Sequence, residues 1–259
     1  MTNKNPVGFF DSGVGGISVL KKAMELLPDE DFVYYGDSLH APYGDKDVET
    51  IKIFSKNATE FLLSHHCKAI VVACNTATSA AVEDLRITYA PLPIIGIEPA
   101  LKVAIEKTIS GDILVLATNR TLVEEKFETL LKRYQQNRTI STLALQGLVE
   151  IIEEGVDIQE KAYEYLSQVL PNENSSFSAV VLGCTHYPFV IPSLKRIFPS
   201  HTMIVDGSEG TAKRLKEVLT SKNLLNFNNP HRKIMLCNSS PHEEMIHLSK
   251  KLLETDYDK

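Results

Sequence analysis

The sequence predicts an α/β protein with two similar lobes, each with a mainly parallel sheet flanked by helices. Short apolar runs alternate with segments of helical length, a pattern typical of parallel sheets. The segment around Cys74 recurs around Cys184, at an offset of 184 − 74 = 110 residues. Repeated lobes are often related by a pseudo-two-fold axis, so we expect the active site in a cleft between them. Residues 1–97 with 208–259 would form the lobe that carries Cys74, and residues 98–207 the lobe that carries Cys184.

The N-terminal part of the chain contains four strand–helix units. Strands are expected at residues 7–10, 32–35, 69–73 and 94–97, and helices at 17–27, 47–65, after Thr76 and from about Pro99. In the segment 47–65, apolar residues recur at helical spacing, at Ile51, Phe54, Ala58, Phe61 and Leu62. Pro99 suits the first turn of a helix, where its missing N–H is not needed.

The remaining elements continue the alternation. Strands are expected at 113–117, 139–145, 179–183 and 203–205, and helices at 121–134, 148–154, 157–169, 188–198 and 210–219. A last strand at 233–237 and a last helix at 241–253 complete the chain. This succession supports the α/β class.

Composition and charge exclude several classes of protein. A net charge of −6 without clustered basic residues argues against a nucleic-acid partner. The N-terminal residues have no secretory signal pattern, and no apolar run reaches the roughly 18–20 residues that span a bilayer. We therefore expect a cytoplasmic protein without a membrane partner.

The chain has four cysteines: Cys67, Cys74, Cys184 and Cys237. They form no C-x-x-C pair and no Cys/His cluster at zinc spacing, so no metal site is expected. A reducing cytoplasm disfavours disulfides. Cys67 and Cys237 have no polar motif beside them and are expected to be structural.

The repeated segments Cys74-Asn75-Thr76 and Cys184-Thr185-His186 are the most informative. Each thiol ends an apolar strand and precedes a predicted helix, where ligands bind in open α/β sheets and where a thiolate is stabilised. One such cysteine could simply be buried at a strand end. Two with matching surroundings favour a functional pair.

Polar residues at two further strand ends are expected at the same edge. The segment Asp11-Ser12-Gly13-Val14-Gly15-Gly16 could hold a small anion at a helix start, with Asp11 suited to an ammonium group. A tight turn and a nucleotide site are the alternatives, although the segment matches neither G-x-G-x-x-G nor a P-loop. Pro42-Tyr43-Gly44 is either a plain turn or a further part of the site at this edge of the sheet.

Two opposed thiols favour acid–base chemistry. To invert a stereocentre, one group must remove a proton from one face while another delivers a proton to the other face. Donors at the helix starts would stabilise the carbanion that forms, and Asp11 and His186 could assist proton transfer at Cys74 and Cys184.

The sequence resembles the glutamate racemases of the aspartate/glutamate racemase family over nearly its whole length. The resemblance rests on separated motifs: Phe10-Asp11-Ser12-Gly13-Val14-Gly15-Gly16, Tyr35-Gly36-Asp37, Pro42-Tyr43-Gly44, Ala73-Cys74-Asn75-Thr76-Ala77, Leu182-Gly183-Cys184-Thr185-His186-Tyr187-Pro188 and Asp206-Gly207. It implies cofactor-independent interconversion of L- and D-glutamate, with Cys74 taking the proton from D-glutamate and Cys184 from L-glutamate. It also implies a homodimer whose product feeds peptidoglycan synthesis.

The resemblance further assigns residues to the substrate. Those expected to bind or assist glutamate are Asp11, Ser12, Tyr43, Gly44, Asn75, Thr76, Thr118, Thr121, Thr185 and His186. The family's Gly-Thr-x-x-Thr is Ala117-Thr118-Asn119-Arg120-Thr121 here, and its Cys-Pro is Leu145-Gln146. The second departure leaves open whether Glu150 or Glu153 is the assisting carboxylate.

The sequence leaves three alternatives open. An aspartate racemase of the same family would typically carry Cys-Thr-Glu where this chain has Cys184-Thr185-His186. A non-catalytic amino-acid-binding protein would not need two thiols. A redox dithiol protein would be expected to have a local C-x-x-C.

Overall fold

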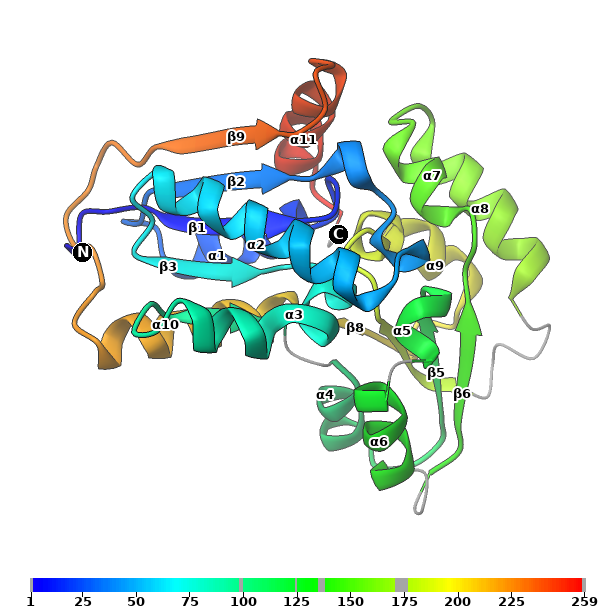
Figure 1. The fold of residues 1–259 in the computed structure, drawn as a ribbon. Helices are drawn as coiled ribbons and strands as arrows, with labels where there is room; N and C mark the ends of the chain where they lie inside the picture. The colour runs from blue at the N-terminus through cyan, green and yellow to red at the C-terminus, as the bar shows by residue number, and fades with distance from the viewer. Residues whose placement is uncertain (1, 98–99, 124, 135–137, 171–176, 258–259) are drawn as a thin grey trace. The chain divides into compact units, whose positions relative to one another are not determined.

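The computed structural model describes residues 2–97, 100–123, 125–134, 138–170 and 177–257. The chain forms two compact units: Met1–Glu98 with Ser208–Glu254, and Pro99–Gly207 with Thr255–Lys259. Each contains one parallel sheet flanked by helices (Figure 1), so the predicted α/β class is confirmed. The expected helix start at Pro99 falls outside the described residues. None of the helices that the structure describes is long and apolar enough to cross a bilayer.

The first unit has a five-stranded sheet in the order β4-β3-β1-β2-β9, with all neighbours parallel. Its strands are β1 (Val7–Asp11), β2 (Phe32–Gly36), β3 (Ala69–Val72), β4 (Ile94–Gly96) and β9 (Ile234–Asn238). Residues on both faces of β1 and β3 are buried, as in a sheet covered on both sides.

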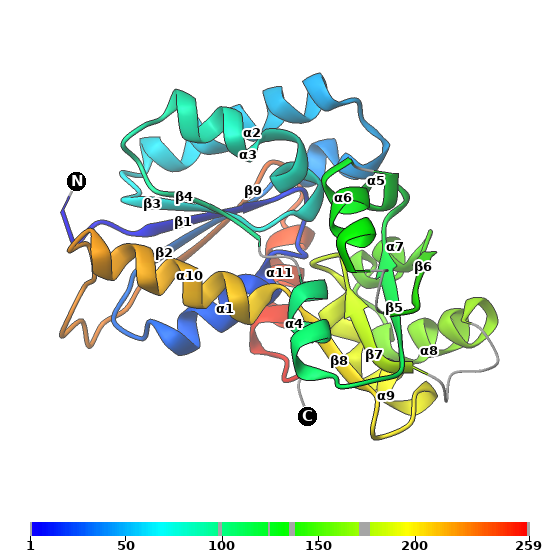
Figure 2. The same ribbon diagram turned by 90° about the horizontal axis from the view of Figure 1, so that it is seen from below.

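Helices cover both faces of this sheet (Figure 2). They are α1 (Ile17–Leu26), α2 (Val48–Ser64), α3 (Asn75–Thr88), α10 (Ser208–Ser221) and α11 (Glu244–Glu254). The helices α2 and α3 pack together on one face, and α1 packs with α10 and α11 on the other. Asp47 caps α2 by accepting the Thr50 N–H at 2.9 Å. Between β2 and α2, the chain makes two 3-10 turns, η1 (Ser38–His40) and η2 (Tyr43–Asp45).

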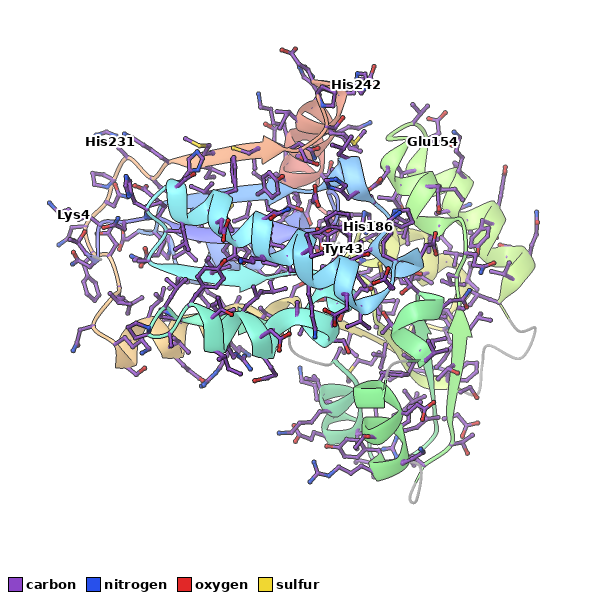
Figure 3. All side chains as sticks on the ribbon, viewed as in Figure 1. Lys4, Tyr43, Glu154, His186, His231 and His242 are labelled. Atoms are coloured by element: carbon purple, nitrogen blue, oxygen red, sulfur yellow. The ribbon has the colours of Figure 1, made fainter. Side chains whose placement is uncertain are left out.

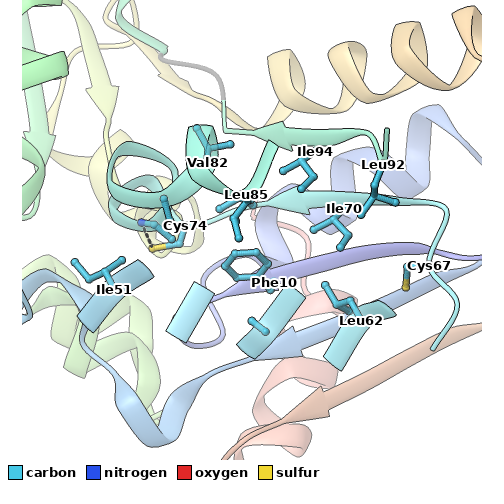
Figure 4. Packing of buried hydrophobic residues seen from close by; sticks show 14 of the residues in the cluster. Phe10, Ile51, Leu62, Cys67, Ile70, Cys74, Val82, Leu85, Leu92 and Ile94 are labelled. Carbon is cyan, nitrogen blue, oxygen red and sulfur yellow. Dashed lines mark hydrogen bonds between the residues drawn. The ribbon is translucent and has the colours of Figure 1, made fainter. Parts of the chain in front are cut away.

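A cluster of buried side chains lies between the sheet and α2 and α3 (Figure 4). Phe10 and Leu85 lie near its centre, with Cys67 toward one end and Cys74 and Ile51 toward the other. Cys67 is fully buried, and burial, with a smaller effect of Cys237, raises its pKa to about 12. This thiol is therefore a neutral packing group.

The second unit has a four-stranded parallel sheet in the order β6-β5-β7-β8. Its strands are β5 (Asp112–Ala117), β6 (Ile140–Ala144), β7 (Phe177–Leu182) and β8 (Met203–Asp206). Its helices are α4 (Ala100–Lys107), α5 (Asn119–Val123), α6 (Glu125–Tyr134), α7 (Leu148–Glu153), α8 (Ile158–Val169) and α9 (Ile191–Ile197), with a 3-10 turn η4 (Tyr187–Val190). The segment 121–134, expected as one helix, is helical in α5 and α6, and residue 124 between them lies outside the described residues.

The internal repeat extends to the topology. The order β4-β3-β1-β2 of the first sheet equals β8-β7-β5-β6 of the second when the strands of each unit are taken in chain order. Among the described residues, the first sheet has one strand more than the second, β9. The tail differs from expectation, because residues from Thr255 onward group with the second unit. There the ring of Tyr257 packs edge-on against Phe189, with ring centroids 5.0 Å apart.

Candidate active site

In the first unit, the strand register brings polar residues to one edge of the sheet. Asp11 is opposite Gly36 in the β1–β2 pairing, and Phe10 is opposite Val72 in the β1–β3 pairing. The strands therefore end level with one another, and Cys74 follows two residues after Val72. This is the carboxyl edge, where α/β proteins bind ligands.

Asp11 is fully buried and accepts the Gly13 N–H at 3.0 Å. Tyr34 donates its hydroxyl to the Gly13 carbonyl at 2.7 Å and so holds the turn after β1. Gly16 is required at the start of α1, because a Cβ there would lie 2.8 Å from Cβ of Asp11 and 2.9 Å from Cβ of Ala73. The glycine allows the helix to pack closely against the strand ends.

Cys74 is the N-cap of α3, and its sulfur accepts the Ala77 N–H at 3.4 Å. Its S–H donates to Ser12 Oγ at 3.6 Å. The side chain is 6% exposed. A backbone donor and the positive end of the helix dipole both favour the thiolate.

Two expected binding residues, Asn75 and Thr76, form the first turn of α3. The helix is fixed to the sheet by Thr78, whose hydroxyl donates to the Val72 carbonyl at 3.0 Å and accepts the Ile97 N–H at 3.1 Å. The position of Cys74 is thus determined by hydrogen bonds on both sides of the strand end.

The η2 turn carries Tyr43 and Gly44 at the carboxyl end of the first sheet (Figure 3). Tyr43 is buried, and its hydroxyl donates to Asp37 Oδ2 at 2.7 Å. Asp37 belongs to the motif Tyr35-Gly36-Asp37, but the sequence reasoning assigns it no function. Its position directly after a strand and three residues before His40 indicates a role at this edge of the sheet.

In the second unit, Cys184 follows β7 at the carboxyl edge of the sheet. Gly183 is needed there because a Cβ would lie 2.9 Å from Cβ of Ala117 and 3.2 Å from the Leu116 carbonyl oxygen. The Gly183 N–H donates to that same carbonyl at 2.7 Å. The backbones of β5 and β7 thus approach closely just before the thiol.

The surroundings of Cys184 differ from those of Cys74. In the first unit, the Thr78 N–H donates to the Cys74 carbonyl at 2.9 Å, as in an α-helix. The corresponding residue after Cys184 is Pro188, which has no N–H. The Tyr187 N–H donates to the Cys184 carbonyl instead, at 3.1 Å, and the chain enters a 3-10 turn. The helix expected at 188–198 therefore begins as the 3-10 turn Tyr187–Val190, and its α-helical part is Ile191–Ile197.

An imidazole takes the place of the backbone donor at Cys184. The sulfur lies 3.7 Å from His186 Nδ1, and His186 Nε2 lies 2.8 Å from Glu153 Oε1. Burial lowers the pKa of His186, but the hydrogen bonds and charges of Cys184 and Glu153 outweigh it and hold this pKa well above its ordinary value. A protonated imidazole can donate to both partners and stabilise a Cys184 thiolate.

The contact with His186 distinguishes the two glutamates of α7 that are candidates for the assisting carboxylate. Glu153 reaches His186, whereas Glu150 is exposed one turn earlier.

The two threonines after β5 contact each other: Thr118 Oγ1 lies 3.0 Å from Thr121 Oγ1 and accepts the Thr121 N–H at 3.4 Å. Thr185, which lies between Cys184 and His186 in the sequence, is also buried.

The described residues offer no metal centre. Within those parts of the chain, no group of three or more His, Cys, Asp or Glu side chains is placed to hold a metal ion. All four cysteines are free thiols.

Comparisons with known proteins identify the family. A sequence model of the Asp/Glu/hydantoin racemase family matches residues 16–215. A glutamate racemase of Clostridium botulinum is 49% identical over 251 residues, which are 96% of this chain and 97% of the relative.

Two solved structures have the same fold. A glutamate racemase isoform of Bacillus anthracis superposes with a TM-score of 0.85 at 29% identity, over 97% of this chain and 95% of that one. A Francisella tularensis glutamate racemase in complex with D-glutamate has a TM-score of 0.79 at 28% identity, over 98% and 95%. The resemblance found in the sequence is confirmed. The chain belongs to the Asp/Glu/hydantoin racemase family and, within it, to the glutamate racemases.

Proposed function

We propose that this protein interconverts L- and D-glutamate by proton exchange at Cα between Cys74 and Cys184. The observation that carries the proposal is the repeated placement of a thiol at the carboxyl end of the third strand in two units of equal strand order. Each sulfur has its own hydrogen-bond partner, Ala77 N–H at one and His186 at the other. One chain thus supplies two thiols, each with a nitrogen donor beside its sulfur.

For D-glutamate, the Cys74 thiolate removes the Cα proton and Cys184 donates its thiol proton to the opposite face. This leaves a Cys74 thiol and a Cys184 thiolate, which His186 stabilises. For L-glutamate the two roles are exchanged. The difficult step is formation of the carbanion, which backbone and side-chain donors around the carboxylate stabilise. The residues proposed to hold glutamate are Asp11, Ser12, Asn75, Thr76, Thr118, Thr121 and Thr185, together with the turn of Tyr43 and Gly44.

Glutamate is the proposed substrate because the Francisella tularensis relative was solved with D-glutamate and because His186 follows Cys184. The direct test is chiral chromatography of L-glutamate after incubation with the protein. D-glutamate should accumulate until the enantiomers are equal. Turnover of aspartate in place of glutamate would support the aspartate racemase alternative, and no turnover of either would contradict the proposal.

The mechanism is tested by Cys74→Ala and Cys184→Ala, with Cys237→Ala as the control. Each of the first two should nearly abolish racemisation at an unchanged melting temperature, while the control retains activity. In D2O, the wild-type protein should place deuterium at Cα of the product enantiomer. Full activity in either Cys74→Ala or Cys184→Ala would be incompatible with two-base exchange.

The proposal also requires both sulfurs to reach opposite faces of one Cα. A short bifunctional thiol reagent should therefore join Cys74 to Cys184, and D-glutamate should prevent the cross-link. Peptide mapping identifies the joined residues. A reagent that modifies each thiol but never joins them would contradict this requirement.

We further propose that the product supplies peptidoglycan synthesis in the cytoplasm and that the protein acts as a homodimer. Expression of the chain should restore growth of a bacterial strain that requires added D-glutamate. Light scattering should give twice the 28.8 kDa mass of the chain. Failure of either experiment would remove that part of the proposal.

A further inference from the structure

Asp37 is a buried carboxylate that the proton-exchange mechanism does not use. It follows β2 directly, and its N–H donates to the Asp11 carbonyl at 2.9 Å. Its side chain is 4% exposed. The sheet thus places this carboxylate at the same edge as Asp11 and Cys74.

Two aromatic side chains from the following turns bind this carboxylate. Tyr43 donates its hydroxyl to Asp37 Oδ2 at 2.7 Å. Nδ1 of His40 lies 2.8 Å from Oδ1 and 3.0 Å from Oδ2 of Asp37. The turns η1 and η2 are therefore joined through one side chain.

The helix α2 supports the same arrangement through Phe54. The His40 ring is stacked on Phe54 at a centroid distance of 4.1 Å, and the Tyr43 ring lies 5.7 Å from Phe54. Burial raises the pKa of Tyr43, and the charge of Asp37 raises it further. The phenol therefore remains protonated and can keep donating to Asp37.

The η2 turn also packs against α3, the helix that Cys74 caps. Tyr43 and Cys74 belong to the same buried cluster. A shift of the Tyr43 ring would therefore disturb the buried cluster that includes Cys74.

We propose that Asp37 and Tyr43 are positioning residues, whose hydroxyl–carboxylate bond fixes the Tyr43-Gly44 turn beside the Cys74 helix for glutamate binding. This inference rests on the proposed function. It assigns the Tyr43 hydroxyl to Asp37 and leaves binding of substrate to the backbone of the turn. Both enantiomers use the same turn, so the bond contributes to binding of both.

The test compares Tyr43→Phe and Asp37→Asn with wild type in both directions of racemisation. Loss of a hydrogen bond to a charged partner should raise KM for each enantiomer about tenfold, with a smaller change in kcat. Tyr43→Phe with Asp37→Asn in one chain should be no worse than the poorer single variant, because Tyr43→Phe removes the Tyr43–Asp37 bond that Asp37→Asn already weakens, whereas only Asp37→Asn also alters the contact with His40. Tyr89→Phe is the matched control, since it deletes a hydroxyl that donates to Glu60 at 3.1 Å on the outer side of α2 and α3.

A purely structural role would lower the melting temperature without changing KM, because KM does not depend on the fraction of folded enzyme. An unchanged KM in Tyr43→Phe, or additive effects in the double variant, would overturn the inference.

Hydrogen exchange separates this inference from the proposed function. The Lys46 N–H donates to the Tyr43 carbonyl at 3.1 Å and reports on the turn. It should exchange faster in Tyr43→Phe than in wild type, even if the wild type proves inactive on glutamate. Equal exchange rates would overturn the inference without touching the racemase activity.

Discussion

Glu153 Oε1 lies 2.8 Å from Nε2 of His186, although the two residues are 33 positions apart in the chain. Glu153 comes from α7, and His186 from the turn after β7. The carboxylate holds the imidazole in place and favours its protonated form. The protonation of the His186 imidazole, which lies beside Cys184, thus depends on a carboxylate from α7.

Replacing Glu153 by Gln should lower the pKa of His186, because the amide removes the negative charge at Nε2. If protonated His186 assists Cys184, the loss of activity at high pH should then begin at a lower pH than in wild type. We expect kcat/KM at neutral pH to fall by about tenfold to a hundredfold. A pH profile of racemisation measures both effects.

Glu150→Gln is the matched control, since Glu150 is exposed on the same helix. It should leave the pH profile close to that of wild type. Equal effects of the two substitutions would mean that the contact with His186 is not the cause.

The raised pKa of His186 also predicts how stability depends on pH. The folded protein binds this proton more tightly than the unfolded chain, where the pKa is about 6.5. The stabilisation is therefore complete below about pH 6.5 and is lost as the pH rises through the folded pKa. Urea unfolding of wild type and His186→Asn over this range should give curves that approach each other at high pH. Parallel curves would contradict this assignment.

Most elements could be predicted from the sequence because hydrophobic periodicity is a local property. The predicted strands and most helices agree with the structure to within a few residues, and the shared strand order of the two units follows from the repeat around Cys74 and Cys184. The different turn after Cys184 could also have been predicted, since Pro188 cannot supply the helical N–H.

The contact of Glu153 could not be predicted, because it depends on the orientation of α7. That helix begins after Gly147, which has a φ of +90°, and the preceding loop is held by the Tyr187 hydroxyl, which donates to the Leu145 carbonyl at 3.1 Å. Tyr165 donates to the Gln146 carbonyl. These contacts are between distant parts of the chain, and spacing along one helix does not reveal them.

A buried ion pair in the first unit gives a prediction about stability. Lys68 Nζ donates to Glu30 Oε2 and to the Asn3 carbonyl, at 2.5 Å in each case, and the side chains of Lys68 and Glu30 are 0% and 1% exposed. Glu30→Gln leaves the ammonium buried without its counter-charge. We expect it to lower the free energy of unfolding by about 3–5 kcal/mol.

Replacing both partners, by Lys68→Met with Glu30→Leu, should recover a large part of that loss, because neither charge then remains buried. Urea unfolding measures all three proteins. The exposed pair Arg214–Glu217 is the control, and Glu217→Gln should change little. A double variant less stable than Glu30→Gln would show that the pair itself stabilises the fold.

The thiols should differ in their reaction with iodoacetamide. Alkylation requires the thiolate, and Cys67 is fully buried with a pKa of about 12. Cys74 accepts a backbone N–H, and Cys184 lies beside His186, so both should react before Cys67 at about pH 8. Mass spectrometry of peptides gives each rate, and activity should fall with modification of Cys74 or Cys184. Saturating D-glutamate should slow reaction at these two thiols and leave the rate at Cys237 unchanged, whereas equal protection of Cys237 would indicate a general tightening of the protein instead of occupation of the site.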